Sequence, residues 1–191
     1  MITSTTTLVP DNPAAAYAAY RQAASAVFLA GTQGLKYKKD HYDLAVDLSK
    51  AGMQYIEERE DDIVIGAMTP LWQIKISPLI QEYAGGALSK AISAVADKHV
   101  QRYGTLGGVI SGKAPFSVLL PILLSLHVDV QLQDKGCMSL DDYLYCPPMG
   151  ELVTGISIAK EAVYTAYKAY RKLPADEPYL LGAVAMRKDS W

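Results

Sequence analysis

The sequence predicts a mixed fold of α/β and α+β character with two subdomains. Over residues 1–55, a helical segment and short apolar runs indicate a small α/β subdomain with parallel strands. Over residues 56–158, strand-like and helix-like segments follow one another in an α+β pattern. A chain of 191 residues is long enough for one domain or for two small ones, which agrees with this division.

The elements of the first subdomain follow from one helix start and two apolar runs. Asn12-Pro13 is a typical N-cap followed by proline at the first helical position, so we expect a helix over residues 14–24. Residues 27–30 and 44–48 are short apolar runs, which are typical of buried strands.

The second subdomain should contain strands interrupted by short helices. The strands are expected at residues 55–58, 63–68, 127–133 and 152–158. Helices should begin at Thr69-Pro70 and Ser77-Pro78, a longer helix should cover residues 87–99, and Ser139 should cap a helix over residues 140–144.

The tail over residues 159–191 is the third segment of the chain, and it is rich in tyrosine. Tyr164, Tyr167 and Tyr170 recur every three residues. We interpret this spacing as packing along one face of a helix rather than as a binding site.

Composition excludes several classes of function. Half of the residues are hydrophobic, a fifth are charged, and the formal net charge is −2. This balance argues against a nucleic-acid-binding protein, which normally carries a basic patch. The longest apolar run, residues 116–126, is too short to span a bilayer, so no membrane association is expected.

Cysteine and histidine do not form a metal-binding pattern. Cys137 and Cys146 are the only cysteines, too few for an iron–sulfur cluster held by four thiolates. His41, His99 and His127 lie far apart, without the spacing of metal ligands. The N-terminus lacks the layout of a signal peptide, so we expect a cytoplasmic, reduced protein.

Two glycine-containing loops are the candidate binding elements. Thr105-Leu106-Gly107-Gly108 is typical of an ordinary tight turn, but adjacent glycines can also aim several main-chain N–H groups at one anion. A second such loop, Gly31 to Gly34, directly follows the expected strand at residues 27–30, and ligands of parallel sheets bind beyond the carboxyl ends of the strands. A dinucleotide with a central pyrophosphate would need two such loops. We therefore expect Gly31 and Gly107 to face each other across a cleft.

The chain resembles the FAD-binding medium subunit of the molybdenum hydroxylases, the group that contains xanthine dehydrogenase and carbon monoxide dehydrogenase. The resemblance runs from about Leu8 to Met186 and rests on several short motifs in the family's order. These are Leu29-Ala30-Gly31-Thr32 for A-G-G-T-D-L, Val46-Asp47-Leu48-Ser49 for V-D-L-S, Ile65-Gly66-Ala67-Met68-Thr69 for I-G-A-x-T, Thr105-Leu106-Gly107-Gly108 for T-[IL]-G-G-N, Ala114-Pro115 with Pro121 for S-P-x-x-D-x-x-P, and Gly150-Glu151-Leu152 for G-E-L.

The resemblance implies a cofactor, partners and site residues. It implies FAD held between the two subdomains, with electrons received from a partner's iron–sulfur clusters and delivered to an acceptor such as NAD. The implied partners are an iron–sulfur subunit and a molybdopterin subunit, and no residue of this chain is expected to be catalytic by itself. The implied flavin contacts are Leu29, Ala30, Gly31, Thr32, Gln33 and Gly34 in the first loop and Thr105, Gly107 and Gly108 in the second.

The chain departs from the family pattern mostly at the expected ligand. The first loop can be aligned with the family motif in two ways. With a one-residue deletion, Thr32 is the family's threonine; without a deletion, Thr32 stands at a glycine position. Val109 and Val118 stand where the family has asparagine and aspartate, and Gln101-Arg102 stands for its Arg-Asn pair. By comparison with the family pattern, we expect the last subdomain to be largely missing. A flavin-poor relative that serves as an assembly or interaction module, or an unrelated α/β domain, therefore remain alternatives to a flavin-binding subunit.

Overall fold

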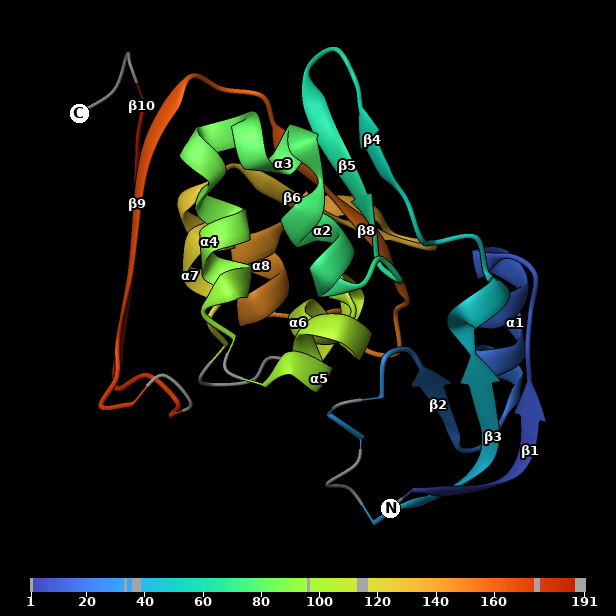
Figure 1. The fold of residues 1–191 in the computed structure, drawn as a ribbon. Coiled ribbons are helices and arrows are strands. Elements are labelled where there is room, and N and C mark those ends of the chain that lie inside the picture. Colours follow the sequence, from blue (N-terminus) through green and yellow to red (C-terminus); the bar gives the residue numbers. More distant parts are fainter. Residues whose placement is uncertain are drawn as a thin grey trace.

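The computed structural model describes residues 2–32, 34–35, 39–95, 97–112, 117–173 and 176–187. Within these ranges the chain forms three sheets, each belonging to a different part of the sequence (Figure 1). We call these parts the N-terminal unit, the central unit and the C-terminal hairpin. The described residues combine helices with one parallel and two antiparallel sheets, so the mixed fold expected from the sequence is confirmed.

The N-terminal unit is a parallel sheet with one helix packed on it. Its elements are β1 (Thr3–Leu8), α1 (Pro13–Gln22), β2 (Ala26–Leu29), β3 (His41–Asp47) and the 3-10 helix η2 (Leu48–Lys50). The strand order is β1-β3-β2, and both pairs are parallel. Asn12 caps α1 as expected, because its side-chain oxygen accepts a hydrogen bond from the main-chain N–H of Ala15 at 2.8 Å. Strand β1 was not expected, because its run of threonines shows no alternation of apolar and polar residues.

The central unit is an antiparallel sheet against which the helices of the middle of the chain pack (Figure 1). Its strands are β4 (Ile56–Glu58), β5 (Asp62–Gly66), β6 (Val128–Leu132), β7 (Gly136–Ser139) and β8 (Val153–Ala159), in the order β4-β5-β8-β6-β7. Its helices are α2 (Leu71–Ile76), α3 (Pro78–Glu82), η3 (Tyr83–Gly86), α4 (Ala87–Ser93), α5 (Lys98–Tyr103), α6 (Leu106–Gly112), α7 (Leu120–Ser125) and α8 (Leu140–Tyr145). No helix in the described part of the chain is long and apolar enough to cross a membrane.

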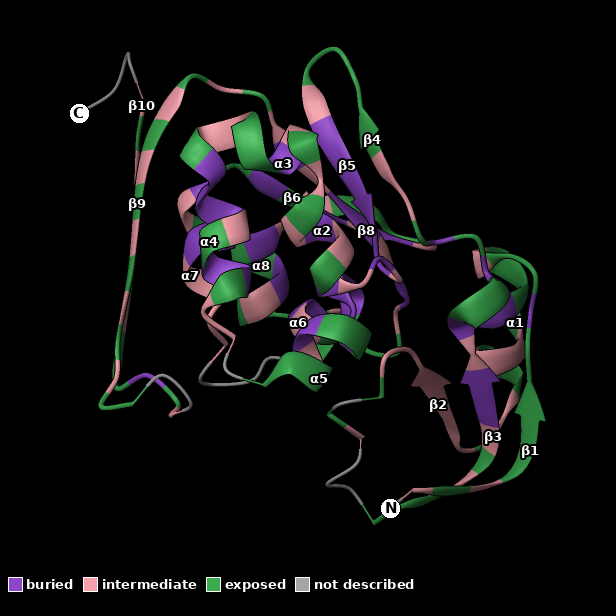
Figure 2. Ribbon diagram, viewed as in Figure 1, coloured by how far each residue is buried: buried purple, intermediate pink, exposed green. Residues whose placement is uncertain are grey.

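The main core lies between the central sheet and these helices. Figure 2 shows the buried residues concentrated there, whereas the N-terminal unit has a smaller core of its own. The smaller core consists of Ala16, Tyr17, Val46, Leu48, Ala51, Met53 and Leu152. Leu152 belongs to the central unit, and Met68, which follows β5, packs against the same core, so this core extends across the junction of the two units.

The helix expected over residues 87–99 is wrong in its extent, because two helices occupy this stretch. Helix α4 ends at Ser93, and α5 starts anew at Lys98. Asp97 accepts hydrogen bonds from the main-chain N–H groups of His99 and Val100, and this capping makes a new helix start more favourable than continuation of α4.

The C-terminal hairpin replaces the helix expected from the tyrosine spacing. Strands β9 (Val163–Tyr170) and β10 (Leu180–Arg187) pair in antiparallel fashion, and Figure 1 shows them beside α4 and α7, away from the N-terminal unit. Because side chains alternate in a strand, Tyr164 and Tyr170 are exposed while Tyr167 packs against the main core. The helical interpretation of this spacing was therefore wrong.

Candidate functional site

The first loop leaves the end of β2 and lies directly against the central unit. Leu29 ends β2, and Ala30, Gly31 and Thr32 follow it, with Thr32 exposed. A Cβ atom at Gly31 would overlap the main-chain carbonyl oxygen of Tyr103 and would lie 3.1 Å from Cα of Gly104. Only glycine permits this approach. The first loop therefore touches the segment that leads into Thr105.

The rest of the first loop is open. Thr32 has φ of 55°, in the left-handed region, and its carbonyl oxygen accepts a hydrogen bond from the main-chain N–H of Leu35 at 3.1 Å. Gly34 has open space around the position of a Cβ atom. Gln33 lies outside the described residues.

The second motif is a helix start, not the glycine turn that was expected. Gly107 and Gly108 lie in the first turn of α6, and neither is among the described glycines with positive φ. Thr105 is buried, and its Oγ1 accepts a hydrogen bond from the main-chain N–H of Gly108 at 3.2 Å. Threonine thus caps the helix, which explains why the expected turn was wrong.

The main-chain donors of this helix start already have partners within the chain. The N–H of Leu106 donates to the carbonyl of Thr69 at 3.1 Å, and the N–H of Gly107 donates to the carbonyl of Ala67 at 2.8 Å. The N–H of Val109 donates to the carbonyl of Thr105 at 3.1 Å. The expected anion-binding nest of free N–H groups is therefore absent from the first turn of α6 in this structure.

The I-G-A-x-T motif supports this helix start. A Cβ atom at Gly107 would lie 2.8 Å from Cβ of Ala67, so the helix packs closely on the end of β5. The fully buried hydroxyl of Thr69 donates to the carbonyl of Tyr55 at 2.9 Å and accepts from its N–H at 3.1 Å. This motif fixes α6 against the segment that joins the N-terminal unit to the central unit.

The two groups of candidate flavin contacts approach each other at Gly31, and they differ in accessibility. Gly31 meets the Tyr103–Gly104 main chain, and Gly108 is exposed on α6, next to Gly107, which is buried against Ala67. A Cβ atom at Gly108 would meet only Oγ1 of Thr105, at 3.1 Å.

Val109 and Val118 do not point to a ligand. Both are partly buried and pack against the main core. Gln101, at the position of the family's arginine, is buried and donates from Nε2 to the carbonyl of Val95 at 2.6 Å. These departures from the family pattern are used for packing.

Sequence reasoning missed Tyr103 and Gly104 at the contact between the loops. The Tyr103 ring is 54% exposed, lies 6.3 Å from the ring of His99, and has the guanidinium of Arg102 5.9 Å from its centroid. Its only signal in the sequence is its position just before the T-L-G-G motif.

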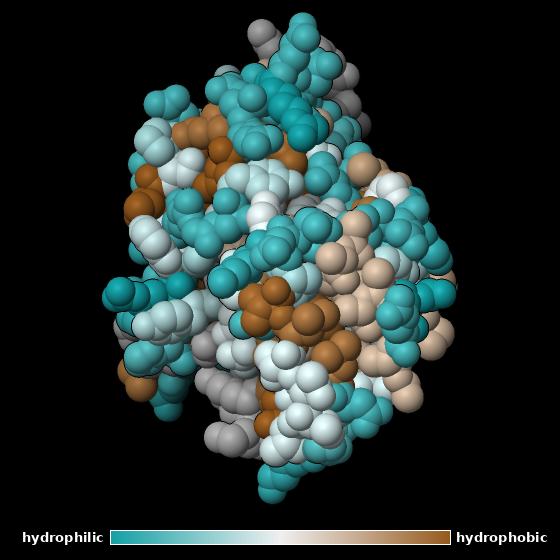
Figure 3. Space-filling model, turned by 90° about the vertical axis from the view of Figure 1, so that its right-hand side faces the viewer, coloured by the Kyte–Doolittle hydropathy of each residue, from teal (hydrophilic) through white to brown (hydrophobic). Residues whose placement is uncertain are grey.

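The face of the molecule seen in Figure 3 mixes hydrophilic side chains with smaller apolar areas.

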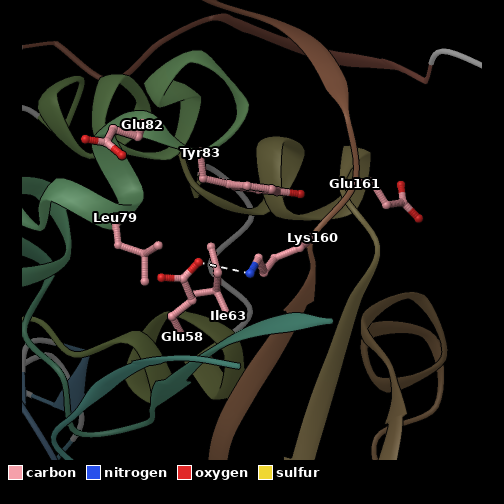
Figure 4. Close-up of a pocket in the computed structure, with 7 residues that line it drawn as sticks. All are labelled: Glu58, Ile63, Leu79, Glu82, Tyr83, Lys160 and Glu161. Carbon is pink, nitrogen blue, oxygen red and sulfur yellow. Dashed lines mark ion pairs between the residues drawn. The ribbon is translucent and has the colours of Figure 1, made fainter. Parts of the chain in front are cut away.

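A separate pocket lies on the central unit, away from the flavin loops. Figure 4 shows the residues that line it, which are Glu58, Ile63, Leu79, Glu82, Tyr83, Lys160 and Glu161. Nζ of Lys160 pairs with Oε1 of Glu58 at 2.9 Å, and the hydroxyl of Tyr83 donates to the carbonyl of Ala159 at 2.7 Å. Because these polar groups are already paired, we assign no chemistry to this pocket.

The described residues contain no cluster of histidine, cysteine and carboxylate side chains that could hold a metal ion.

Comparison with solved structures shows the same fold in larger oxidoreductase chains. A chain of the CO dehydrogenase from Oligotropha carboxidovorans superposes with a TM-score of 0.85 at 23% identity, covering 99% of this chain and 70% of that one. A chain of quinoline 2-oxidoreductase from Pseudomonas putida 86 gives a TM-score of 0.85 at 18% identity, covering 96% of this chain and 67% of that one.

Sequence comparison finds relatives that are longer than this chain. The Uncharacterized protein YgfM of Escherichia coli K12 is 29% identical over 163 residues, which are 84% of this chain and 61% of YgfM. The nicotinate dehydrogenase FAD-subunit of Eubacterium barkeri is 31% identical over 131 residues, which are 65% of this chain and 44% of that protein. This chain therefore spans less than two thirds of the length of either relative.

Residues 3–160 match the family described as the FAD binding domain in molybdopterin dehydrogenase. The match covers the N-terminal unit and the central unit, including both loops that meet at Gly31 and Tyr103. FAD is the cofactor of this family, in agreement with the resemblance of the motifs. The chain belongs to the FAD-binding domains of the molybdopterin dehydrogenases.

Proposed function

We propose that this chain is the FAD-binding electron-transfer subunit of a molybdenum hydroxylase-type oxidoreductase in the cytoplasm. In this proposal it receives electrons from the iron–sulfur clusters of a partner subunit and passes them to an external acceptor such as NAD. The observation that carries the proposal is the contact of Gly31 with the Tyr103–Gly104 main chain, because it joins the two family loops at the boundary of the two units.

The residues of this chain would bind and orient the cofactor. The exposed main chain around Thr32 and Gly34 would hold one part of FAD, and the exposed start of α6 at Gly108 would hold another. When bound, FAD supplies the redox chemistry. We propose subdomain boundaries of 1–55, 56–158 and 159–191, so that the cofactor lies where the first and second subdomains meet.

Electrons must enter from another chain. Four thiolates are needed for the usual iron–sulfur cluster, and the sequence contains only Cys137 and Cys146. We therefore expect a tagged form of the protein to co-purify with an iron–sulfur subunit and a molybdopterin subunit from its native host. Repeated isolation of flavin-loaded protein without either partner would contradict the proposed assembly.

The flavin site is tested by adding one methyl group at Gly108. Gly108→Ala should change the stability of α6 little, because a more favourable helix propensity of up to about 1 kcal/mol is offset by the contact of the new Cβ atom with Oγ1 of Thr105 at 3.1 Å. The same methyl group should block close approach of FAD and weaken its binding. Gly112→Ala is the matched control, because Gly112 is exposed on the same helix and its Cβ atom would meet open space.

FAD titrations and thermal melts of the three proteins decide the proposal. We expect weaker flavin binding with an unchanged or higher melting temperature for Gly108→Ala, and wild-type affinity for Gly112→Ala. Equal affinity of all three proteins for FAD would show that α6 does not contact the flavin.

A second candidate function is that of a flavin-poor assembly module. It is favoured by the fact that the first N–H groups of α6 have partners within the chain, and by the packing of Val109 and Val118 on the core. The absorption spectrum separates the two functions. A colourless protein that does not take up added FAD, yet co-purifies with the hydroxylase subunits, would support the assembly module.

A further inference from the structure

The Gly150-Glu151-Leu152 motif is not part of either flavin loop, yet all three of its residues face the N-terminal unit. Gly150 has φ of 68°, and a Cβ atom there would lie 3.6 Å from the ring of Tyr20 on α1. Leu152 is 4% exposed and packs in the core of the N-terminal unit. The motif immediately precedes β8 of the central unit. It therefore connects the two units at a point distant in sequence from the segment that joins them.

Glu151 makes this connection with both of its carboxylate oxygens. The hydroxyl of Tyr17 on α1 donates to Oε2 at 3.3 Å, and the main-chain N–H of Asp134 donates to Oε1 at 2.9 Å. Asp134 lies between β6 and β7, so a single carboxylate joins the helix of one unit to a turn of the other. Hydrogen bonds to an ionised acceptor are stronger than those between neutral groups.

The environment keeps Tyr17 in its donor form. Burial raises the pKa of the Tyr17 hydroxyl above its ordinary value, and the negative charge of Glu151 raises it further. The guanidinium of Arg21 lies 5.9 Å from the centroid of the same ring. The hydroxyl is therefore protonated at neutral pH and able to donate to the carboxylate.

Two further contacts set the position of the N-terminal unit. The joining segment is held where the N–H of Met68 donates to the carbonyl of Met53 at 2.8 Å. The first flavin loop touches the central unit where Gly31 meets the Tyr103 carbonyl. Any rotation of the N-terminal unit about the joining segment changes the distance between the two flavin loops.

We propose that Gly150-Glu151-Leu152 is a clasp that fixes the orientation of the N-terminal unit, and that Glu151 is a positioning residue for FAD. This inference rests on the proposed flavin function. Opening of the clasp lowers the fraction of molecules in which the loops are correctly spaced, and the apparent dissociation constant rises in inverse proportion to that fraction.

The test compares Tyr17→Phe with Tyr42→Phe. Tyr42 belongs to the same unit, and its hydroxyl also donates to a carboxylate at 3.3 Å, but that carboxylate is Asp40 of the same unit. Glu151→Ala removes both hydrogen bonds of the clasp, whereas Glu151→Gln keeps an acceptor for Asp134 and an amide group for the Tyr17 hydroxyl. The readouts are the dissociation constant of FAD, the radius of gyration of the flavin-free protein in solution scattering, and the melting temperature.

We expect Tyr17→Phe to weaken FAD binding by up to about fivefold, the limit set by the loss of about 1 kcal/mol. Glu151→Ala should weaken it more and should increase the radius of gyration. Tyr42→Phe should stay close to the wild type, and Glu151→Gln should lie between the wild type and Glu151→Ala, because its hydrogen bonds are kept but lose the ionised acceptor. Unchanged FAD affinity and radius of gyration in a folded Glu151→Ala protein would overturn the clasp, even if its melting temperature falls.

The failure of the proposed function has a different signature. If the wild-type protein takes up no FAD, both the proposed function and the role of Glu151 in positioning the cofactor are rejected. The radius of gyration then still decides whether the clasp sets the orientation of the two units.

Discussion

Thr32 is the residue of the first loop at which a single substitution should improve both the fold and the flavin site. A β-branched residue at positive φ is a conformational outlier, and Thr32 has φ of 55°. The left-handed conformation costs an ordinary residue about 1–2 kcal/mol, whereas glycine adopts it freely. This conformation is what a glycine position requires, so it favours the alignment without a deletion, in which Thr32 takes the place of the second glycine of A-G-G-T-D-L.

Thr32→Gly should therefore stabilise the protein by a small amount. The relief of about 1–2 kcal/mol is offset in part by the greater freedom of glycine in the unfolded chain, which costs about 0.5–1 kcal/mol. The expected net gain is up to about 1.5 kcal/mol, and 1 kcal/mol raises the melting temperature of a protein of this size by about 2–4 °C. FAD binding should also tighten, because the loop loses a side chain at the point where the family has none.

Ala84→Gly is the matched control for this experiment. Ala84 is the other described non-glycine residue with positive φ, at 50°, and it lies in η3 of the central unit. Its replacement should raise the melting temperature without changing the affinity for FAD. A fall in stability of Thr32→Gly, with the expected gain in Ala84→Gly, would show that the Thr32 side chain makes a contact that outweighs the strain.

Three further predictions concern buried or paired groups. Val109→Asn combined with Val118→Asp should lower the melting temperature without strengthening FAD binding, because each polar group enters the edge of an apolar core. Tighter FAD binding would show instead that both positions contact the flavin. Thr69→Ala should cost about 1–3 kcal/mol in urea unfolding, because it removes two hydrogen bonds and leaves the main-chain N–H of Tyr55 without its acceptor. A cost below that range would show that water replaces the hydroxyl. Although burial opposes its ionisation, hydrogen bonds from Arg187 and His127 hold the pKa of Glu161 below its ordinary value. Its contribution to stability is therefore present above the ordinary carboxyl range and is lost as the pH falls through the lowered pKa. Glu161→Gln should flatten this acid dependence of the unfolding free energy, and an unchanged profile would refute the assignment.

Local capping signals predicted helix starts well, since a cap depends on a few adjacent residues. Asn12 and Ser139 cap α1 and α8 as expected, each with a side-chain oxygen that accepts a main-chain N–H. Strands β2, β3, β6 and β8 also lie close to where the apolar runs placed them.

The errors arose where a pattern has two structural solutions. Adjacent glycines suit a tight turn, but Gly107 and Gly108 are used for the close approach of a helix to Ala67 and for a cap by Thr105. Tyrosines at intervals of three suit a helix face, but all three of these tyrosines lie on β9 and pair with residues of β10 in the C-terminal hairpin. Only tertiary contacts, which are not encoded by local spacing, decide between these solutions.

The family motifs in this chain divide into those that hold the fold and those that face the expected cofactor. Thr69, Gly107 and Leu152 make buried contacts within the chain, and substitution at any of them would disturb the junction of the two units. Thr32, in contrast, lies in the exposed first loop, where the family's glycine is not kept. A sequence that retains these buried motifs keeps the junction of the two units even where the exposed first loop departs from the family. Substitutions that tighten flavin binding are therefore expected in the first loop rather than at the buried contacts. If Thr32→Gly binds FAD no better than the wild type while Gly108→Ala still weakens binding, the FAD affinity is limited by α6 and not by the first loop. The first N–H groups of α6 already have partners within the chain.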